Sequence, residues 1–259
     1  MMHVNEFLER VDKALNSKTL YVSGCFGAPM SEELGPTQGK FRYLNNNYVN
    51  QQEPNHTWIL NATFDTFGFD CVNLIKGCVW EWDGDVTRVY GGAGYKINGL
   101  EECNANSILT RYGYDVSSDF SKIVPGEIVW MQDHVGVYVG NGYVVEATSR
   151  WEHKVLKSVC LNVMDTADIH RRKWSRHGKL KCLDYGEAKT PVIVEPVAKP
   201  VESDIVKYKV VKGDNLTKIA AKYNTTVDKI VERNKPTHAK MTRNFICVGW
   251  VLEIKVGEK

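Results

Sequence analysis

The chain has 259 residues, of which 25% are charged and 43% are hydrophobic, and its formal net charge is +2. This length allows a core domain and a smaller second one. No apolar run is long enough to cross a bilayer, so the composition excludes a membrane-inserted protein. The seven cysteines are an odd number without metal-ligand spacing. We therefore expect reduced thiols, no metal and no cofactor.

The first residues predict an amphipathic helix, because Val4, Phe7, Leu8, Val11 and Leu15 recur at helical spacing. They do not form a basic segment followed by an apolar one. We therefore expect no signal peptide and synthesis in the cytoplasm.

Two features follow this helix. Tyr21 precedes a short Gly-rich turn over residues 23–27. The alternative interpretation of Tyr21 is an aromatic residue that only packs in the core. Residues 34–61 are rich in Asn and Gln and carry few periodic apolar residues. They are expected to form an insertion that borders a groove.

Cys71 lies where a loop is predicted to become a helix. Cys71, Ile75, Cys78 and Val79 recur at spacings of three and four, and Asp70 is placed to cap the helix. The helix N-terminus favours a thiolate, whereas the carboxylate of Asp70 opposes it, so a nearby imidazolium is expected as well. The alternative interpretation is a small buried thiol that only packs.

Residues 134–139 alternate as a half-buried strand, with His134 and Gly136 on one face. Asn141-Gly142 is typical of a hairpin turn. A two-residue turn there would leave Glu146 on the face away from His134. A three-residue turn over residues 140–142 with a Gly bulge would instead pair Gly136 with Glu146 and place Glu146 beside His134.

We predict the three-residue turn. With this turn, Cys71 is predicted to be a nucleophile, His134 its base and Glu146 the carboxylate that orients the His134 ring. Such a combination supports acyl transfer. The alternatives are a structural histidine at position 134 and a solvated strand charge at position 146.

The basic run at residues 171–181 contains Trp174, but no nucleic-acid-binding motif accompanies it, so no nucleic-acid partner is predicted. Residues 186–206 contain three prolines among Val, Lys and Glu. This composition favours an extended linker, which divides the chain into domains at residues 1–185 and 207–256.

The segment after the linker predicts a βααβ module. Residues 208–212 alternate as a strand, and Asp214 is placed to cap a helix whose apolar stripe begins at Leu216. Thr225 with Asp228 predicts a capping box for a second helix. Residues 250–254 alternate again and predict the closing strand.

At the Cys71 and His134 segments the chain resembles the NlpC-type cell-wall endopeptidases, a papain-like group that cuts peptidoglycan stem peptides. The resemblance rests on Asp70-Cys71, on residues 134–138 (His-Val-Gly-Val-Tyr), on Glu146 twelve residues after His134, and on the Gly-Glu-Ile-Val-Trp segment at 126–130. It implies an α+β, papain-like catalytic domain in which the Cys71 helix packs on an antiparallel sheet. It also implies that Tyr21 and Asp70 bind substrate.

The resemblance has departures. Val72-Asn73 stands where the family usually has Ser-Gly. A Glu as third partner also looks like the related CHAP amidohydrolases.

From Tyr208 to Ile254 the chain resembles a LysM module, most clearly at residues 208–220 (Tyr-Lys-Val-Val-Lys-Gly-Asp-Asn-Leu-Thr-Lys-Ile-Ala) and at Val248-Gly249. The resemblance implies binding of N-acetylglucosamine-containing glycans between two loops. The implied contact residues are Gly213, Asp214, Asn215, Leu216, Thr217 and Ile246. Residues 206–259 hold twelve Lys or Arg against five Asp or Glu, which suits an anionic wall.

These features predict a peptidoglycan hydrolase of the phage endolysin type, made in the host cytoplasm and acting on the bacterial cell wall. By resemblance, the bond cleaved joins γ-D-glutamate to diaminopimelate or lysine. The alternatives are a CHAP-like N-acetylmuramoyl-L-alanine amidase and a wall-binding protein without catalysis. The expected partners are the stem peptide and the glycan of peptidoglycan, with no nucleic acid and no membrane insertion.

Overall fold

The computed structural model describes residues 1–35, 37–186, 205–210, 214–223, 225–238, 240–243 and 245–255. The chain divides into two compact units, Met1–Ile193 and Val194–Lys259. The division falls within the segment predicted as a linker. The extended conformation predicted for that segment concerns residues 187–204, which lie outside the described ranges.

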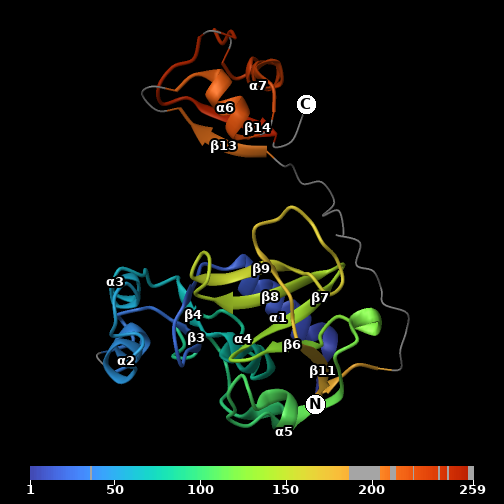
Figure 1. Cartoon of the computed structure of the whole chain (residues 1–259). Helices are drawn as coiled ribbons and strands as arrows, with labels where there is room; N and C mark the ends of the chain where they lie inside the picture. Colours follow the sequence, from blue (N-terminus) through green and yellow to red (C-terminus); the bar gives the residue numbers. More distant parts are fainter. Residues whose placement is uncertain are drawn as a thin grey trace. The chain divides into compact units, whose positions relative to one another are not determined.

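The first unit is built on a seven-stranded sheet with the order β10-β9-β8-β7-β6-β11-β5 (Figure 1). Neighbouring strands are antiparallel except for the β9–β10 pair. Its strands are β5 (Gly113–Ser117), β6 (Ile128–Met131), β7 (His134–Gly140), β8 (Tyr143–Thr148), β9 (Lys154–Cys160), β10 (Arg171–Arg172) and β11 (Arg176–Leu180).

Helices α1 (Val4–Asn16) and α4 (Cys71–Val79) pack against this sheet. The predicted amphipathic helix is confirmed in α1, which buries Val4, Phe7 and Val11. Every residue of α4 is buried, and valines of β7 and β8 join it in one core. The first unit is thus a mixed domain in which the helix that carries Cys71 lies on a largely antiparallel sheet, as expected.

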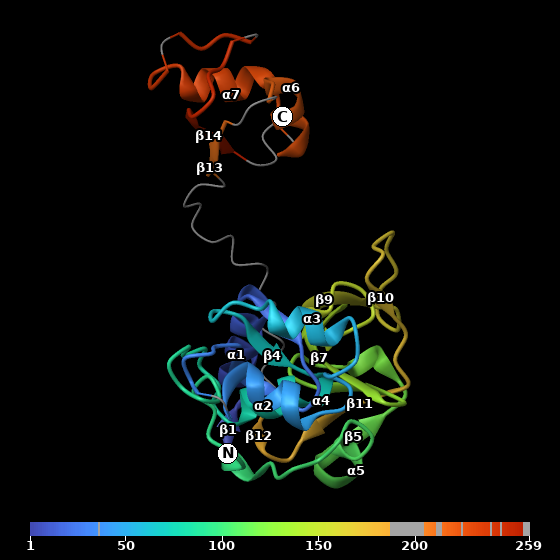
Figure 2. The ribbon, with the colours of Figure 1, turned by 90° about the vertical axis from the view of Figure 1, so that its left-hand side faces the viewer.

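A smaller sheet with the order β2-β4-β3 precedes α4. Its strands are β2 (Thr19–Tyr21), β3 (Phe26–Pro29) and β4 (Phe67–Phe69). The Asn-rich insertion folds into α2 (Gly39–Asn46) and α3 (Asn55–Leu60), which lie beside this sheet (Figure 2). The remaining short elements of the unit are β1 (Met2–His3), η1 (Ile97–Gly99), α5 (Ile108–Tyr112), η2 (Phe120–Lys122) and β12 (Leu183–Asp184).

The hairpin between β7 and β8 differs from the prediction. Its turn has two residues, because Gly140 pairs with Tyr143, and both turn residues have positive φ. The predicted three-residue turn is therefore wrong. A bulge between Tyr138 and Gly140 then shifts the register by one, so that Tyr138 faces Val144.

The bulge restores the register that the three-residue turn was expected to create. Continuing the pairing of Val137 with Val145 places Gly136 opposite Glu146. A Cβ added to Gly136 would lie 3.3 Å from the Cβ of Glu146. Glu146 therefore shares a sheet face with His134.

The second unit contains β13 (Ile205–Lys209), α6 (Leu216–Lys222), α7 (Val227–Asn234) and β14 (Val251–Lys255). The two strands pair antiparallel, which confirms the βααβ order. Its core consists of Val210, Leu216, Ile219, Ala220, Ile230, Met241, Leu252 and Ile254.

Both predicted caps of this unit move by one residue. The N–H of Lys218 donates to Asn215 Oδ1 at 2.9 Å, so Asn215 rather than Asp214 caps α6. The N–H of Lys229 donates to Thr226 Oγ1 at 3.3 Å, so Thr226 rather than Thr225 caps α7. In both places two adjacent residues are good caps, and the position of the core stripe selects the second.

Candidate functional site

Cys71 is the first residue of α4, and Asp70 is the N-cap, as predicted. The N–H of Asn73 donates to Asp70 Oδ1 at 2.8 Å, and the N–H of Gly24 donates to Oδ2 at 2.7 Å. The Asn73 side-chain amide also donates to Oδ2. Burial raises the pKa of Asp70 in spite of these donors. The carboxylate predicted to bind substrate is thus engaged in holding the helix start and the Gly24 loop.

The Cys71 side chain is only 7% exposed. Burial, followed by the charge of Asp70, raises the pKa of the thiol to about 12, although the N–H groups of Val135 and Val72 act in the opposite direction. The opposing effect of Asp70 on the thiol is the one expected from the sequence, and the start of the helix does not outweigh it. The group at the start of α4 is a thiol that needs a base.

His134 and Glu146 meet across β7 and β8. The His134 Nε2 atom lies 2.5 Å from Glu146 Oε2. Glu146 is fully buried, whereas the His134 side chain is 15% exposed. A carboxylate at Nε2 assigns the ring proton to that nitrogen and leaves Nδ1 as an acceptor.

Glu146 is held by residues that the sequence analysis did not single out. Ser158 Oγ donates to Oε1 at 2.5 Å. The Arg172 guanidinium grips the carboxylate as a fork, with Nε 3.3 Å from Oε1 and Nη2 3.0 Å from Oε2. Burial pushes the pKa of Glu146 upward, but His134, Arg172 and Ser158 together hold it below its ordinary value. The carboxylate therefore stays ionised although no solvent reaches it.

Trp174 completes this cluster. Its ring stacks on His134 with centroids 5.6 Å apart and an angle of 13° between the planes. The Arg172 guanidinium lies 5.5 Å from the same indole. Both residues belong to the basic run at 171–181, which the sequence analysis treated only as a charge pattern. Arg172 and Trp174 are buried while Arg171 and Lys173 are exposed, and the tryptophan among the cations was the available sequence signal.

The Cys71 sulfur lies beside the backbone at the start of β7, where His134 is the first residue. The Val135 N–H contacts the Cys71 sulfur, and this N–H belongs to the peptide that follows His134. No hydrogen bond joins the Cys71 and His134 side chains in the described part of the unit. Catalytic hydrogen bonds are often loose before substrate binds.

Tyr21 lies next to this site. It pairs with Phe69, two residues before Cys71, because β2 and β4 are parallel. Burial and the neighbouring charges of Cys71 and Asp70 raise the pKa of its hydroxyl. Its ring also packs edge-on against His153, with centroids 5.6 Å apart. The structure thus places the half-buried Tyr21 near the predicted nucleophile.

The predicted glycan-binding residues of the second unit divide into core and surface. Leu216 is 3% exposed and belongs to the core, so its side chain offers little surface to a glycan. Asn215 and Thr217 are exposed, and Asp214 Oδ2 accepts a hydrogen bond from the Tyr208 hydroxyl at 2.8 Å. Gly213 lies outside the described residues.

In the second predicted loop, Ile246 is half-buried and packs on the core. Phe245 and Val248 are the more exposed apolar residues of this loop, at 47% and 65%. The sequence analysis did not select them. They offer the apolar surface that was assigned to Leu216.

Comparison with known protein families supports the resemblance predicted for the second unit. Residues 208–255 match the LysM domain. No match was found for the chain among curated proteins. The C-terminal unit is a LysM domain, which indicates binding to the glycan of peptidoglycan and interaction with the cell wall. No helix within the described ranges is both long and apolar enough to cross a membrane.

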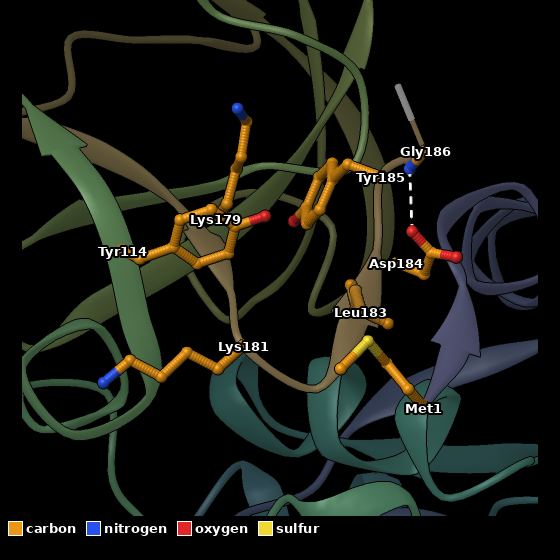
Figure 3. A pocket seen from close by; sticks show the side chains of 8 residues that line it. All are labelled: Met1, Tyr114, Lys179, Lys181, Leu183, Asp184, Tyr185 and Gly186. Atoms are coloured by element: carbon orange, nitrogen blue, oxygen red, sulfur yellow. Dashed lines mark hydrogen bonds between the residues drawn. The ribbon is translucent and has the colours of Figure 1, made fainter. Parts of the chain in front are cut away.

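A separate open pocket of about 370 Å³ contains none of the predicted site residues (Figure 3). Lys179 lies 5.7 and 5.8 Å from the ring centroids of Tyr114 and Tyr185. Its ammonium already pairs with Asp115 at 3.1 Å, and the Tyr185 hydroxyl donates to a backbone carbonyl. Because these polar groups have partners within the protein, we place the candidate chemistry at Cys71.

Proposed function

We propose that the chain is a peptidoglycan hydrolase with a papain-like catalytic unit and a LysM domain that anchors it to the wall. One observation carries the proposal. A buried, ionised Glu146 holds the ring of His134 at the start of β7, and the next N–H of this strand, that of Val135, contacts the sulfur of a cysteine at a helix N-terminus. A structural thiol does not need an oriented imidazole beside it, whereas a nucleophile with a raised pKa does.

The proposed reaction is acyl transfer through a thioester. The Cys71 sulfur attacks the carbonyl carbon of a stem-peptide amide, and its proton passes to Nδ1 of His134. The imidazolium, stabilised by Glu146, then gives this proton to the departing amine as the C–N bond breaks. Water attacks the thioester with His134 again as base, which releases the acid and restores the thiol.

The negative charge of the tetrahedral intermediate has to be stabilised by hydrogen-bond donors. The N–H of Cys71 is free of intrahelical bonding, because it lies in the first turn of α4. The Tyr21 hydroxyl is the second donor in this proposal. Replacing Tyr21 with Phe should lower kcat while leaving KM nearly unchanged.

The bond that we favour joins γ-D-glutamate to the third residue of the stem peptide. The amidase alternative is the bond between muramic acid and L-alanine, because a Glu partner also fits the CHAP type. Mass spectrometry of digested peptidoglycan distinguishes the two. A new N-terminal diaminopimelate or lysine supports the endopeptidase, and a new N-terminal alanine supports the amidase.

The competing proposal is a wall-binding protein without catalysis, which the LysM domain alone would satisfy. The decisive comparison is the turbidity of a wall suspension with the native chain and with Cys71→Ala. We expect the variant to lose lysis by orders of magnitude and to bind walls as before. Equal clearing curves for the two proteins would eliminate the cysteine mechanism.

A further inference from the structure

The Asn-rich insertion presents an indole to solvent. Trp58 lies on α3 and is 42% exposed, which is high for so large an apolar ring. It belongs to a group of exposed apolar side chains in and just after the insertion, which are Tyr48, Val49, Trp58, Leu60 and Phe64. An accumulation of exposed apolar side chains is typical of a binding surface.

Trp58 is connected to the candidate catalytic site through His153. The centroids of the Trp58 and His153 rings are 4.1 Å apart, and those of the His153 and Tyr21 rings are 5.6 Å apart. The N–H of Tyr21 donates to the His153 carbonyl at 2.7 Å, and His153 has a positive φ of 56°. Because Tyr21 lies near Cys71, three rings lead from the predicted nucleophile to the exposed indole.

Helix α3 holds this indole in place. Ile59, the next residue along the helix, is fully buried in a small core that includes Val22. The buried Lys40 ammonium donates to the carbonyls of Leu60 and Ala62 at 2.9 and 3.0 Å, which satisfies the end of the helix. The indole is therefore fixed before a ligand arrives, so less conformational entropy is lost on binding.

Uncharged polar groups lie beside the indole. The Nε2 atom of His153 is buried and has no hydrogen-bond partner in the described part of the unit. Burial lowers the pKa of His153, so its ring is neutral at neutral pH. Asn61 is exposed one turn after Trp58, where its amide can both donate and accept. An aromatic face with such neighbours suits a neutral ligand that has both apolar and hydrogen-bonding groups.

We propose that Trp58 stacks on the pyranose ring of the N-acetylmuramic acid that carries the stem peptide, with His153 and Asn61 beside the sugar. The inference rests on the proposed function and extends its substrate from the peptide to the sugar. This sugar lies on the acyl side of both candidate bonds, so it remains with the part of the substrate that is joined to Cys71. Two amino acids separate it from the favoured bond and span about 7 Å or more when extended, which is the scale of two ring contacts. The catalytic unit then has a glycan contact of its own, in addition to the LysM domain.

The test measures the binding of two soluble ligands to the full-length Cys71→Ala variant. One ligand is L-alanyl-D-glutamate, and the other is the same dipeptide attached to N-acetylmuramic acid. With isotope-labelled tryptophan, each of the seven indoles gives an NMR signal, and that of Trp58 is the one missing after Trp58→Ala. We expect the sugar-bearing ligand alone to move the Trp58 signal, and calorimetry to show that it binds about tenfold more tightly than the free dipeptide.

Substitutions on α3 provide the matched controls. Trp58→Ala should abolish the advantage of the sugar-bearing ligand, whereas Trp58→Tyr, which keeps an aromatic face, should retain most of it. Leu60→Ala removes another exposed apolar side chain from the same helix and should preserve the advantage. The LysM domain is unchanged in all these variants, so any sugar that it binds contributes equally to each measurement.

Equal affinity for the two ligands, no binding of either, an unmoved Trp58 signal, or an advantage that survives Trp58→Ala would overturn the assignment. The reaction is tested separately, because the variant used here lacks the nucleophile. A chain that binds the sugar through Trp58 but does not clear walls keeps this contact and loses the proposed hydrolase. A chain that clears walls but binds both ligands equally keeps the hydrolase and loses the contact.

Discussion

Replacing Arg172 with Met tests whether Glu146 depends on its buried counter-charge. Arg172 is 8% exposed and Glu146 is fully buried. The Arg172 guanidinium lies 4.9 Å from the Trp151 ring centroid and 5.5 Å from that of Trp174. The substitution keeps an unbranched side chain beside these rings but removes both contacts with the Glu146 carboxylate. Glu146 would then hold a charge in the protein interior with only His134 and Ser158 as partners.

The expected loss is large. Removing one partner of a buried ion pair costs about 3–5 kcal/mol, because the other charge remains without compensation. A unit of this size loses roughly 2–4 °C of melting temperature per kcal/mol, so the first unit should melt about 6–20 °C lower. Loss of the fixed imidazole orientation should also lower kcat/KM by about 10²-fold.

The assay compares thermal unfolding and wall clearing for Arg172→Met with those for Arg171→Met. The control removes an adjacent arginine whose pair with Asp165 is exposed and worth about 0.2–1 kcal/mol. Glu146→Gln supplies the second arm of a double-mutant cycle. If Arg172→Met destabilises the Glu146→Gln variant as much as the native protein, Arg172 acts by packing on the tryptophans and the electrostatic reasoning is refuted.

Three further outcomes are expected. Gly136→Ala would bring a Cβ to 2.6 Å from Val144 Cγ1 and 3.3 Å from the Glu146 Cβ. It should lower the free energy of unfolding by about 1–3 kcal/mol and the activity by more than tenfold. Unchanged clearing of a wall suspension would contradict this. The pKa of Glu146 is lower in the folded than in the unfolded protein, so its carboxylate stabilises the fold at pH values above the unfolded-state pKa near 4.3. This stability is lost as the pH falls through the folded-state pKa. Glu146→Gln should therefore flatten the acid side of the curve of stability against pH. Asn234 is buried and bonds the N–H and C=O of Glu253 at 2.7 Å each. Asn234→Ala should therefore cost the LysM domain about 1–3 kcal/mol per group left unpaired and abolish wall pull-down, while cleavage of soluble peptides stays within about twofold.

The helix that carries Cys71 could be predicted from the sequence because its signals are local. The cap at Asp70 and the apolar spacing that follows lie within one short segment. The state of the thiol could not be predicted in this way. The pKa of the thiol depends on how much solvent the sheet excludes, and β7, whose Val135 N–H contacts the sulfur, comes some sixty residues later in the chain.

The hairpin shows how a correct pairing can follow from a wrong turn. The choice rested on register, since only one register places Glu146 beside His134. A bulge and a longer turn change the register by the same single residue, and the segment 139–142 is compatible with both. The alternating residues of β8 indicate which sheet face each side chain occupies. No residue of the turn distinguishes a two-residue turn followed by a bulge from a three-residue turn.

The basic run at residues 171–181 contains Arg172 and Trp174, which the charge pattern alone did not indicate as residues of the site. A run of cations suggests one positive surface, but this run is divided between β10, which lies beside β9, and β11, which lies between β6 and β5. Arg172 turns inward to Glu146, whereas Arg176 lies at a cavity beside Trp130. Arg172 is neutralised by a buried carboxylate, whereas Arg176 is exposed and has no ion-pair partner among the described residues. The two therefore differ in their expected response to substitution: removal of Arg172 should lower stability and catalysis together, and removal of Arg176 should leave the free energy of unfolding nearly unchanged.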